Sequence, residues 1–214
     1  MINNESELKT ILENNTPELR TLDYKLELPK KNYEDRKEFL ADIVSFANSY
    51  GGTIVYGVGD EQDRRRNNTG KPNFPIKGLG DLNEDVEIGT LQQIIQHGIS
   101  AKIIGIDFKL MTLTFDKNDN PSNANPYSAT LLVINIPQSW ASPHMVTLNG
   151  ATRFYGRDSK GKYPMLRAVD IRNAFLMSEG LSEKMESFRE DRIKNIRLGN
   201  TTIGNRKLRP KIVL

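Results

Sequence analysis

The 214-residue sequence contains no cysteine, only two histidines and no long apolar run. Without cysteine the chain cannot form a disulfide, a catalytic thiolate or a cysteine-built zinc site. His97 and His144 are too few for a metal site made of histidines alone. A membrane-spanning helix needs about 20 consecutive apolar residues, so we expect no contact with a membrane. No basic segment followed by an apolar one opens the chain, so we expect no secretion signal and a cytoplasmic location.

Charge is small overall but unevenly distributed. The formal net charge is +3. Residues 1–150 contain 15 Lys/Arg against 20 Asp/Glu, a net charge of −5, whereas residues 151–214 contain 15 against 7, a net charge of +8. A basic C-terminal part indicates a polyanionic partner, or only a solvated helix and tail.

Hydrophobic periodicity predicts an α+β fold with a mixed, mainly antiparallel sheet flanked by helices. The expected helices cover 5–13, 35–50, 84–97, 168–177 and 182–196, and the expected strands cover 22–28, 53–58, 102–115, 129–136, a short stretch near 145, and 153–155. Residues 59–75 are expected to form a long loop. The length suits one domain over 1–180, followed over 181–214 by a C-terminal helix and basic tail that would start a further region.

Three acidic residues, Glu18, Asp23 and Asp60, form the first candidate site. Asp60 follows a buried strand, and Asp23 lies on the polar face of its own strand. Carboxylates within a few ångström repel one another, so a divalent cation such as Mg²⁺ or Mn²⁺ commonly lies between them and can activate water against a phosphodiester. Glu18 and Asp23 can meet only if Glu18 belongs to the turn after Pro17. Three ordinary surface acids are the alternative.

Lys25 lies two residues from Asp23 and therefore on the same face of the strand. The acid-x-Lys spacing resembles the end of a restriction-type nuclease motif, in which the lysine orients the attacking water. An ion pair between Lys25 and an acid on a neighbouring strand is the alternative.

The second candidate site is basic, because charged and aromatic side chains alternate between residues 152 and 157. Arginines can bind phosphates in a bidentate manner, and exposed rings can stack on bases. The candidate phosphate contacts are Arg153, Arg157, Lys160 and Lys162, with Arg64, Arg65 and Arg66 in the long loop as a second group. A strand with its rings in the core and its arginines in solvent is the alternative.

Residues 156–162 match G-x-x-x-x-G-K, the start of a phosphate-binding P-loop. The next residue should be Ser or Thr to hold Mg²⁺, but it is Tyr163, and Pro164 follows. Nucleotide binding is therefore not expected.

Two blocks of the sequence resemble the Schlafen AlbA domain. One is the strand Leu22-Asp23-Tyr24-Lys25, and the other runs from Phe46 to Asp60 with the sequence FANSYGGTIVYGVGD. The family shows an acid-aromatic-Lys strand, a helix ending in Ala-Asn-x-x-Gly-Gly, and a strand closing in Gly-Val-x-Asp. Weaker likeness at Pro143-His144 and at residues 153–159 extends the resemblance over roughly residues 15–175.

The resemblance implies nucleic-acid binding and, as in Schlafen proteins, metal-dependent cleavage of RNA by three carboxylates. These acids match Glu18, Asp23 and Asp60 by position, with Lys25 orienting water or phosphate. Asp23 stands where the family usually has Glu, and Gly59 occupies an often acidic position. The zinc-binding Cys/His set of vertebrate Schlafens is absent, so no zinc is expected.

The expected function is therefore that of a Mg²⁺- or Mn²⁺-dependent endoribonuclease acting on structured RNA such as tRNA, with a role in defence. RNA is favoured over DNA. The alternative is a non-catalytic DNA- or RNA-binding module of a transcriptional regulator. The resemblance also leads us to expect a homodimer whose two copies span a duplex.

Overall fold

The computed structural model describes residues 1–62, 68–115 and 126–197. The helices are α1 (Glu5–Glu13), α2 (Tyr33–Ala47), α3 (Glu84–Gly98) and α4 (Ala168–Arg197). The strands are β1 (Leu22–Lys25), β2 (Gly52–Tyr56), β3 (Asp60–Gln62), β4 (Asn68–Pro72), β5 (Ile99–Ser100), β6 (Asp107–Phe115), β7 (Tyr127–Ile136), β8 (Met145–Leu148), β9 (Ala151–Asp158) and β10 (Gly161–Pro164).

The main sheet has the strand order β1-β2-β7-β6. β1 runs parallel to β2, whereas β2 and β6 both pair with β7 in antiparallel fashion. A second sheet, β10-β9-β8-β5, is antiparallel throughout, and β3 and β4 form a separate hairpin. The α+β class and its mixed, mainly antiparallel sheet are therefore confirmed.

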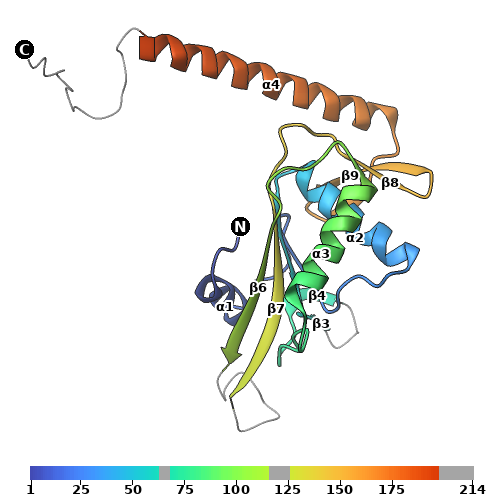
Figure 1. The fold of residues 1–214 in the computed structure, drawn as a ribbon, viewed down its shortest axis with the longest axis vertical. Coiled ribbons are helices and arrows are strands. Elements are labelled where there is room, and N and C mark those ends of the chain that lie inside the picture. Colours follow the sequence, from blue (N-terminus) through green and yellow to red (C-terminus); the bar gives the residue numbers. More distant parts are fainter. Residues whose placement is uncertain (63–67, 116–125, 198–214) are drawn as a thin grey trace, which may run out of the picture.

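Two apolar cores lie on opposite faces of the main sheet. β2 is buried along its whole length, as predicted, and its side chains alternate between the cores because successive residues of a strand point to opposite faces. Ile54 and Tyr56 join α2, α3 and the second sheet, whereas Val55 joins α1. Figure 1 shows the two long strands β6 and β7 with α1 on one side and α2 and α3 on the other.

The turn between α2 and β2 requires glycine. Gly51 has a φ of 67°, and a Cβ added to it would lie 2.5 Å from the backbone nitrogen of Gln138. A larger side chain would therefore be strained and would also collide with backbone. This turn lets the chain leave α2 and enter the centre of the sheet at once.

Three sequence expectations need correction. The segment 59–75 contains the β3–β4 hairpin, which hydrophobic periodicity could not reveal because its residues are mostly polar. The strand beginning at Leu22 ends at Lys25 and does not continue to residue 28. Residues 168–197 form one continuous helix, which passes through Gly180 and the expected boundary near that residue. Among the described residues, no helix is long and apolar enough to cross a membrane.

Candidate functional site

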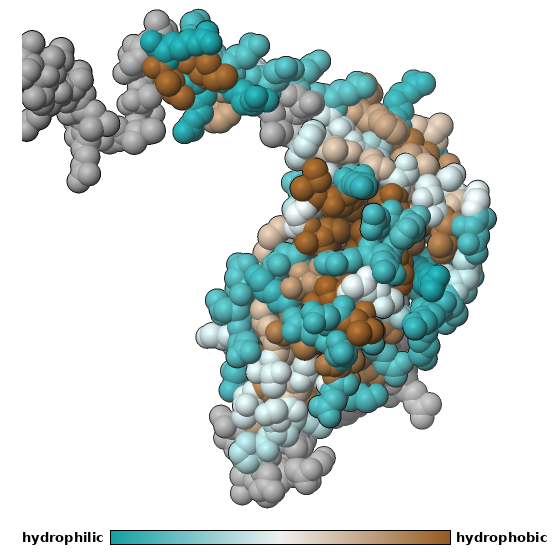
Figure 2. Space-filling model, viewed as in Figure 1, coloured by the Kyte–Doolittle hydropathy of each residue, from teal (hydrophilic) through white to brown (hydrophobic). Residues whose placement is uncertain are grey.

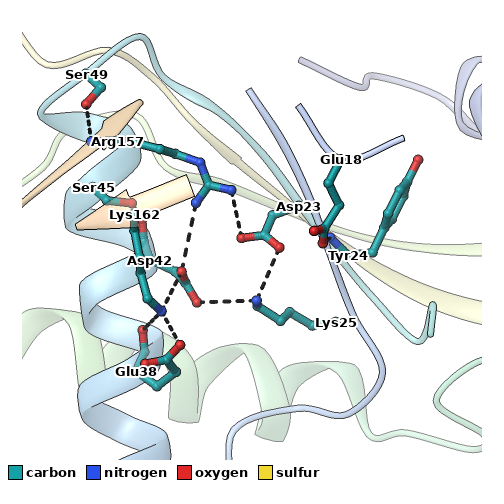
Figure 3. A network of polar contacts seen from close by, with 10 residues as sticks. All are labelled: Glu18, Asp23, Tyr24, Lys25, Glu38, Asp42, Ser45, Ser49, Arg157 and Lys162. Carbon is teal, nitrogen blue, oxygen red and sulfur yellow. Dashed lines mark hydrogen bonds and ion pairs between the residues drawn. The ribbon is translucent and has the colours of Figure 1, made fainter. Parts of the chain in front are cut away.

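Strand β1 lies at the edge of the main sheet and presents Asp23 and Lys25 toward α2. Its other side chains, Leu22 and Tyr24, belong to the core on the α1 side. The sequence predicts that Asp23 lies on a solvated face, but its side chain is only 6% exposed. The reason is that α2 and the second sheet cover this face, which Figure 3 shows in close-up.

Both carboxylate oxygens of Asp23 face a cation. Arg157 Nη2 donates a hydrogen bond of 3.0 Å to Oδ2, and Lys25 Nζ lies 3.2 Å from Oδ1. Burial by itself would raise the pKa of Asp23, but the charges of Lys25 and Arg157 and hydrogen bonds to the carboxylate hold it below its usual value. Asp23 is therefore an ionised, buried and paired acid.

Asp42 is a second buried acid in the same network, and α2 supplies it from a run of buried residues. Its Oδ1 lies 2.8 Å from Lys162 Nζ and 4.0 Å from Arg157 Nη1, and its Oδ2 lies 3.9 Å from Lys25 Nζ. Burial raises the pKa of Asp42, while Lys162 and Lys25 oppose that effect.

Asp42 also explains how two cations can lie side by side. Arg157 on β9 is paired directly with Lys162 on β10, and like charges at opposite positions repel one another. Asp42 lies between them, and the exposed acid Glu38 forms a second ion pair with Lys162. The sequence contains a signal for this role, namely one acid within the apolar stretch 39–47.

The turn after α2 holds the second sheet in place through Asn48. Its Nδ2 donates to the carbonyl oxygens of His144 and Tyr155, both at 2.9 Å, and its Oδ1 accepts from the backbone N–H of His144 at 2.6 Å. This is the asparagine of the Ala-Asn-x-x-Gly-Gly turn. Its physical role is to fasten β8 and β9 to the end of α2.

Arg157 is positioned by the same turn. Its backbone N–H donates to Ser49 Oγ at 2.9 Å, and its guanidinium carbon lies 4.0 Å from the centre of the Phe46 ring. The Arg157 side chain is 5% exposed, so in this arrangement it is not presented to solvent as the predicted phosphate contact would be. The guanidinium is instead directed inward to the acids.

Glu18 lies outside strand β1, in the irregular segment just before it, so it can approach Asp23 as the sequence analysis requires. Its Oε1 accepts the backbone N–H of Tyr24 at 2.8 Å. Burial, a side-chain hydrogen bond with Asp23, and the negative charges of Asp23 and Asp60 together raise the pKa of Glu18 to about 8, although the Tyr24 bond opposes the rise. Near neutral pH, Glu18 is therefore mostly protonated and donates to Asp23.

The three acids come near one another but do not form a complete ligand set for a divalent cation in this arrangement. Glu18 and Asp23 touch, and Asp60, at the start of β3, is near enough for its charge to act on Glu18. Among the described residues, however, no three His, Cys, Asp or Glu side chains form a group that could hold a metal ion. The oxygens of Asp23 that a metal would need already face Lys25 and Arg157.

The remaining basic candidates divide into three sets. Arg153 and Lys160 are exposed. Lys162 is 19% exposed and paired with acids. Arg64, Arg65 and Arg66 lie outside the described residues, between β3 and β4.

Two hollows adjoin the network. A cleft of about 180 Å³ is lined by Lys25, Glu38 and Asp42 together with Leu28 and Tyr56. A larger groove of about 660 Å³ runs between the body and the start of α4, and Arg157 forms part of its wall. Of the three cations in the network, Lys25 has the most exposed side chain, at 34%.

Comparison with known proteins gives one family match. The family model described as "Schlafen, AlbA_2" matches residues 18–166. No curated protein gives a significant match.

Two solved structures are similar at 17% sequence identity. DIP2311 from Corynebacterium diphtheriae aligns with 75% of this chain, which spans only 26% of that protein, with a TM-score of 0.42. The second is the N-terminal domain of a Nitrosomonas europaea protein described as related to the ATP-dependent DNA helicase RecG. It aligns over 70% of this chain and 84% of its own length, with a TM-score of 0.44.

Proposed function

Because the chain belongs to the Schlafen AlbA_2 family, we propose that it binds nucleic acid, with RNA preferred, at the edge of the main sheet beside Lys25. The observation that carries the proposal is the family match over the residues that build the ion network. The network supports it further, because it holds Lys25, whose side chain is 34% exposed, in place next to an open cleft.

Phosphate binding at this edge would use the cations that remain accessible. Arg157 and Lys162 are paired with the buried acids Asp23 and Asp42, so they stabilise the site without touching a ligand. Lys25 is held by Asp23 and Asp42 but keeps a third of its side chain in solvent. Arg153 and Lys160, exposed on β9 and at the β9–β10 turn, add two charges on the second sheet.

Binding is tested with fluorescently labelled tRNA, single-stranded RNA and duplex DNA across a range of salt concentrations. We expect tRNA to bind most tightly, with affinity falling steeply as salt rises because phosphate contacts release counterions. The double variant Arg153→Ala/Lys160→Ala should lower the slope of log affinity against log salt by about 1 to 2. Lys109→Ala, at the opposite edge of the sheet, is the matched control. Failure to bind any of the three at low salt would reject the proposal.

Metal-dependent cleavage of structured RNA, such as tRNA in a defence role, is the second candidate. The observation that favours it is the contact between Glu18 and Asp23 with the charge of Asp60 close by. Incubation of tRNA with Mn²⁺, Mg²⁺ or EDTA tests it directly. Metal-dependent products that disappear in Asp60→Ala but persist in Asp107→Ala would support cleavage.

Intact tRNA under all three conditions would reject cleavage and leave the binding proposal standing. Binding that EDTA leaves unchanged would then favour a non-catalytic module, such as the DNA- or RNA-binding part of a transcriptional regulator. Preference for duplex DNA over tRNA would turn the assignment from RNA to DNA.

A further inference from the structure

The groove of about 660 Å³ beside the start of α4 adjoins the ion network at Arg157. Two contacts hold α4 in place along it. The Phe175 ring meets Phe154 edge to face, and Ser178 Oγ donates to the carbonyl oxygen of Trp140. Figure 1 shows α4 starting beside β8 and β9 before it extends away from both sheets. The volume of the groove lies within the range of about 300 to 1,000 Å³ that is typical of ligand sites.

The groove is polar, but the two charged residues that line it in the described part of the chain are already paired. Arg157 faces Asp23, and Arg167 donates two hydrogen bonds to Asp170, of 2.7 and 2.9 Å. Figure 2 shows hydrophilic and hydrophobic residues mixed where the start of α4 meets the body. Three neutral side chains of the wall can donate and accept hydrogen bonds and bond to no other described residue, namely Gln138, Ser142 and Asn173. Such a groove suits a neutral polar ring better than a phosphate.

An exposed ring and an exposed cation lie where the groove approaches β1. Tyr50 lines the groove and is 57% exposed, and the guanidinium carbon of the exposed Arg20 lies 4.7 Å from the centre of its ring. The Thr53 N–H donates to the carbonyl oxygen of Thr21 at 2.9 Å, which ties the chain after Tyr50 to the start of β1. Arg20 and Lys25 are five residues apart, so their Cα atoms are separated by at most about 18 Å. One strand of nucleic acid can therefore reach both.

We propose that the groove takes an unpaired nucleobase of the bound RNA, an inference that rests on the proposed function. Tyr50 stacks on the base, and the free amides of Gln138 and Asn173 match the donors and acceptors of its edge. Arg20 contacts a neighbouring phosphate. Proteins that bind unpaired strands commonly combine aromatic rings with cations in this way. Because a fully paired duplex offers no free base, the groove makes the protein select RNA with loops or single-stranded ends.

The test compares three labelled RNAs: a hairpin with an unpaired loop, the same hairpin with abasic loop positions, and a blunt duplex. We expect the wild type to bind the first most tightly. Tyr50→Ala should weaken that binding by about 5- to 150-fold and leave binding of the abasic hairpin unchanged, whereas Tyr50→Phe keeps the ring and should match the wild type. Tyr33→Ala is the matched control, because it removes another exposed ring that lies beside a cation, Lys37.

Two further variants separate the base contact from the phosphate contact. Asn173→Ala, on the α4 wall, should weaken binding of the loop hairpin by about 2- to 10-fold and leave the abasic hairpin unaffected. Arg20→Ala should lower the slope of log affinity against log salt by about 1 on both hairpins, whereas Tyr50→Ala should leave the slope unchanged. Circular dichroism and thermal unfolding confirm that each variant is folded.

Equal binding of the loop hairpin by wild type and Tyr50→Ala, or an equal loss on both hairpins, would overturn the inference. Salt-dependent binding by the wild type would still leave the proposed function standing. Free AMP and UMP carry the same ring chemistry, and a groove that binds them without contributing to hairpin binding would also overturn the assignment to RNA. If the wild type binds none of the three RNAs at low salt, the proposed function itself fails, and this inference with it.

Discussion

The guanidinium of Arg157 donates a 3.0 Å hydrogen bond to the carboxylate of Asp23, which lies 134 positions earlier in the chain. This contact joins the edge strand of the main sheet to the second sheet. Both side chains are almost completely buried, so the pair is part of the interior. It is also what keeps Asp23 from acting as a free acid.

Arg157→Met should lower the free energy of unfolding by about 3 to 5 kcal/mol, because it leaves Asp23 buried without its buried ion-pair partner. Urea unfolding measures the change. Arg153→Met, on the same strand but exposed, should change stability by less than about 0.5 kcal/mol. The double variant Asp23→Asn/Arg157→Met should cost less than the sum of the two single changes. Full additivity would mean that the two side chains do not interact.

Glu18 should make the protein less stable as pH rises from about 4.5 to 8. Its pKa is about 8 in the folded protein against an ordinary value of 4.5. The folded state therefore keeps a proton that the unfolded state has lost in this interval, and stability falls with pH wherever the folded state binds more protons.

Glu18→Gln removes this dependence, because the amide stays neutral and can still donate to Asp23. Denaturant unfolding of both proteins between pH 5 and 9 should show the variant gaining stability over the wild type as pH rises. The exposed Glu27→Gln is the control. Parallel curves for wild type and Glu18→Gln would contradict the shifted pKa.

Asn48→Ala should cost about 2 to 4 kcal/mol of stability, because it removes three hydrogen bonds and leaves partly buried backbone groups of His144 and Tyr155 without that partner. Urea unfolding is again the measurement. Asn73→Ala, an exposed asparagine, is the control and should be nearly neutral. Equal stability of the two variants would show that Asn48 does not hold the second sheet.

The sequence predicts most of the fold because local patterns determine it. The buried strand 52–56 shows as a continuous apolar run, and the Ala-Asn-x-x-Gly-Gly turn marks the end of α2. The site is harder to predict because its partners are distant in the chain. Nothing near Arg157 indicates that it turns inward to Asp23, since that depends on how Asn48 and Ser49 dock the second sheet.

The acidic residues also differ in how well the sequence predicts their role. The pattern of acids and the family resemblance both indicate Glu18 and Asp23 as site residues, and the structure brings the two into contact. Asp42 was missed, although an acid within a buried helical face is unusual and must have a partner. Its partners, Lys25 and Lys162, come from two different sheets, so no local spacing could identify them.

His144 should make the protein less stable as pH falls below about 6.5. Its side chain is fully buried, its Nδ1 donates to the carbonyl oxygen of Ala101 at 2.7 Å, and its Nε2 has no hydrogen-bond partner among the described residues. Burial lowers its pKa from the ordinary 6.5, although the Ala101 bond opposes the shift. Below pH 6.5 the unfolded chain therefore takes up a proton that the folded protein does not bind, and stability falls.

His144→Leu tests this, with His97→Leu as the control because His97 is exposed. Carboxylates such as Asp23 also lose stability in acid, so the informative quantity is the difference between each variant and the wild type. Between pH 7 and 5, the wild type and His97→Leu should lose stability in parallel, and His144→Leu should lose less. A smaller acid loss in His97→Leu than in His144→Leu would assign the effect to the wrong histidine and contradict the prediction.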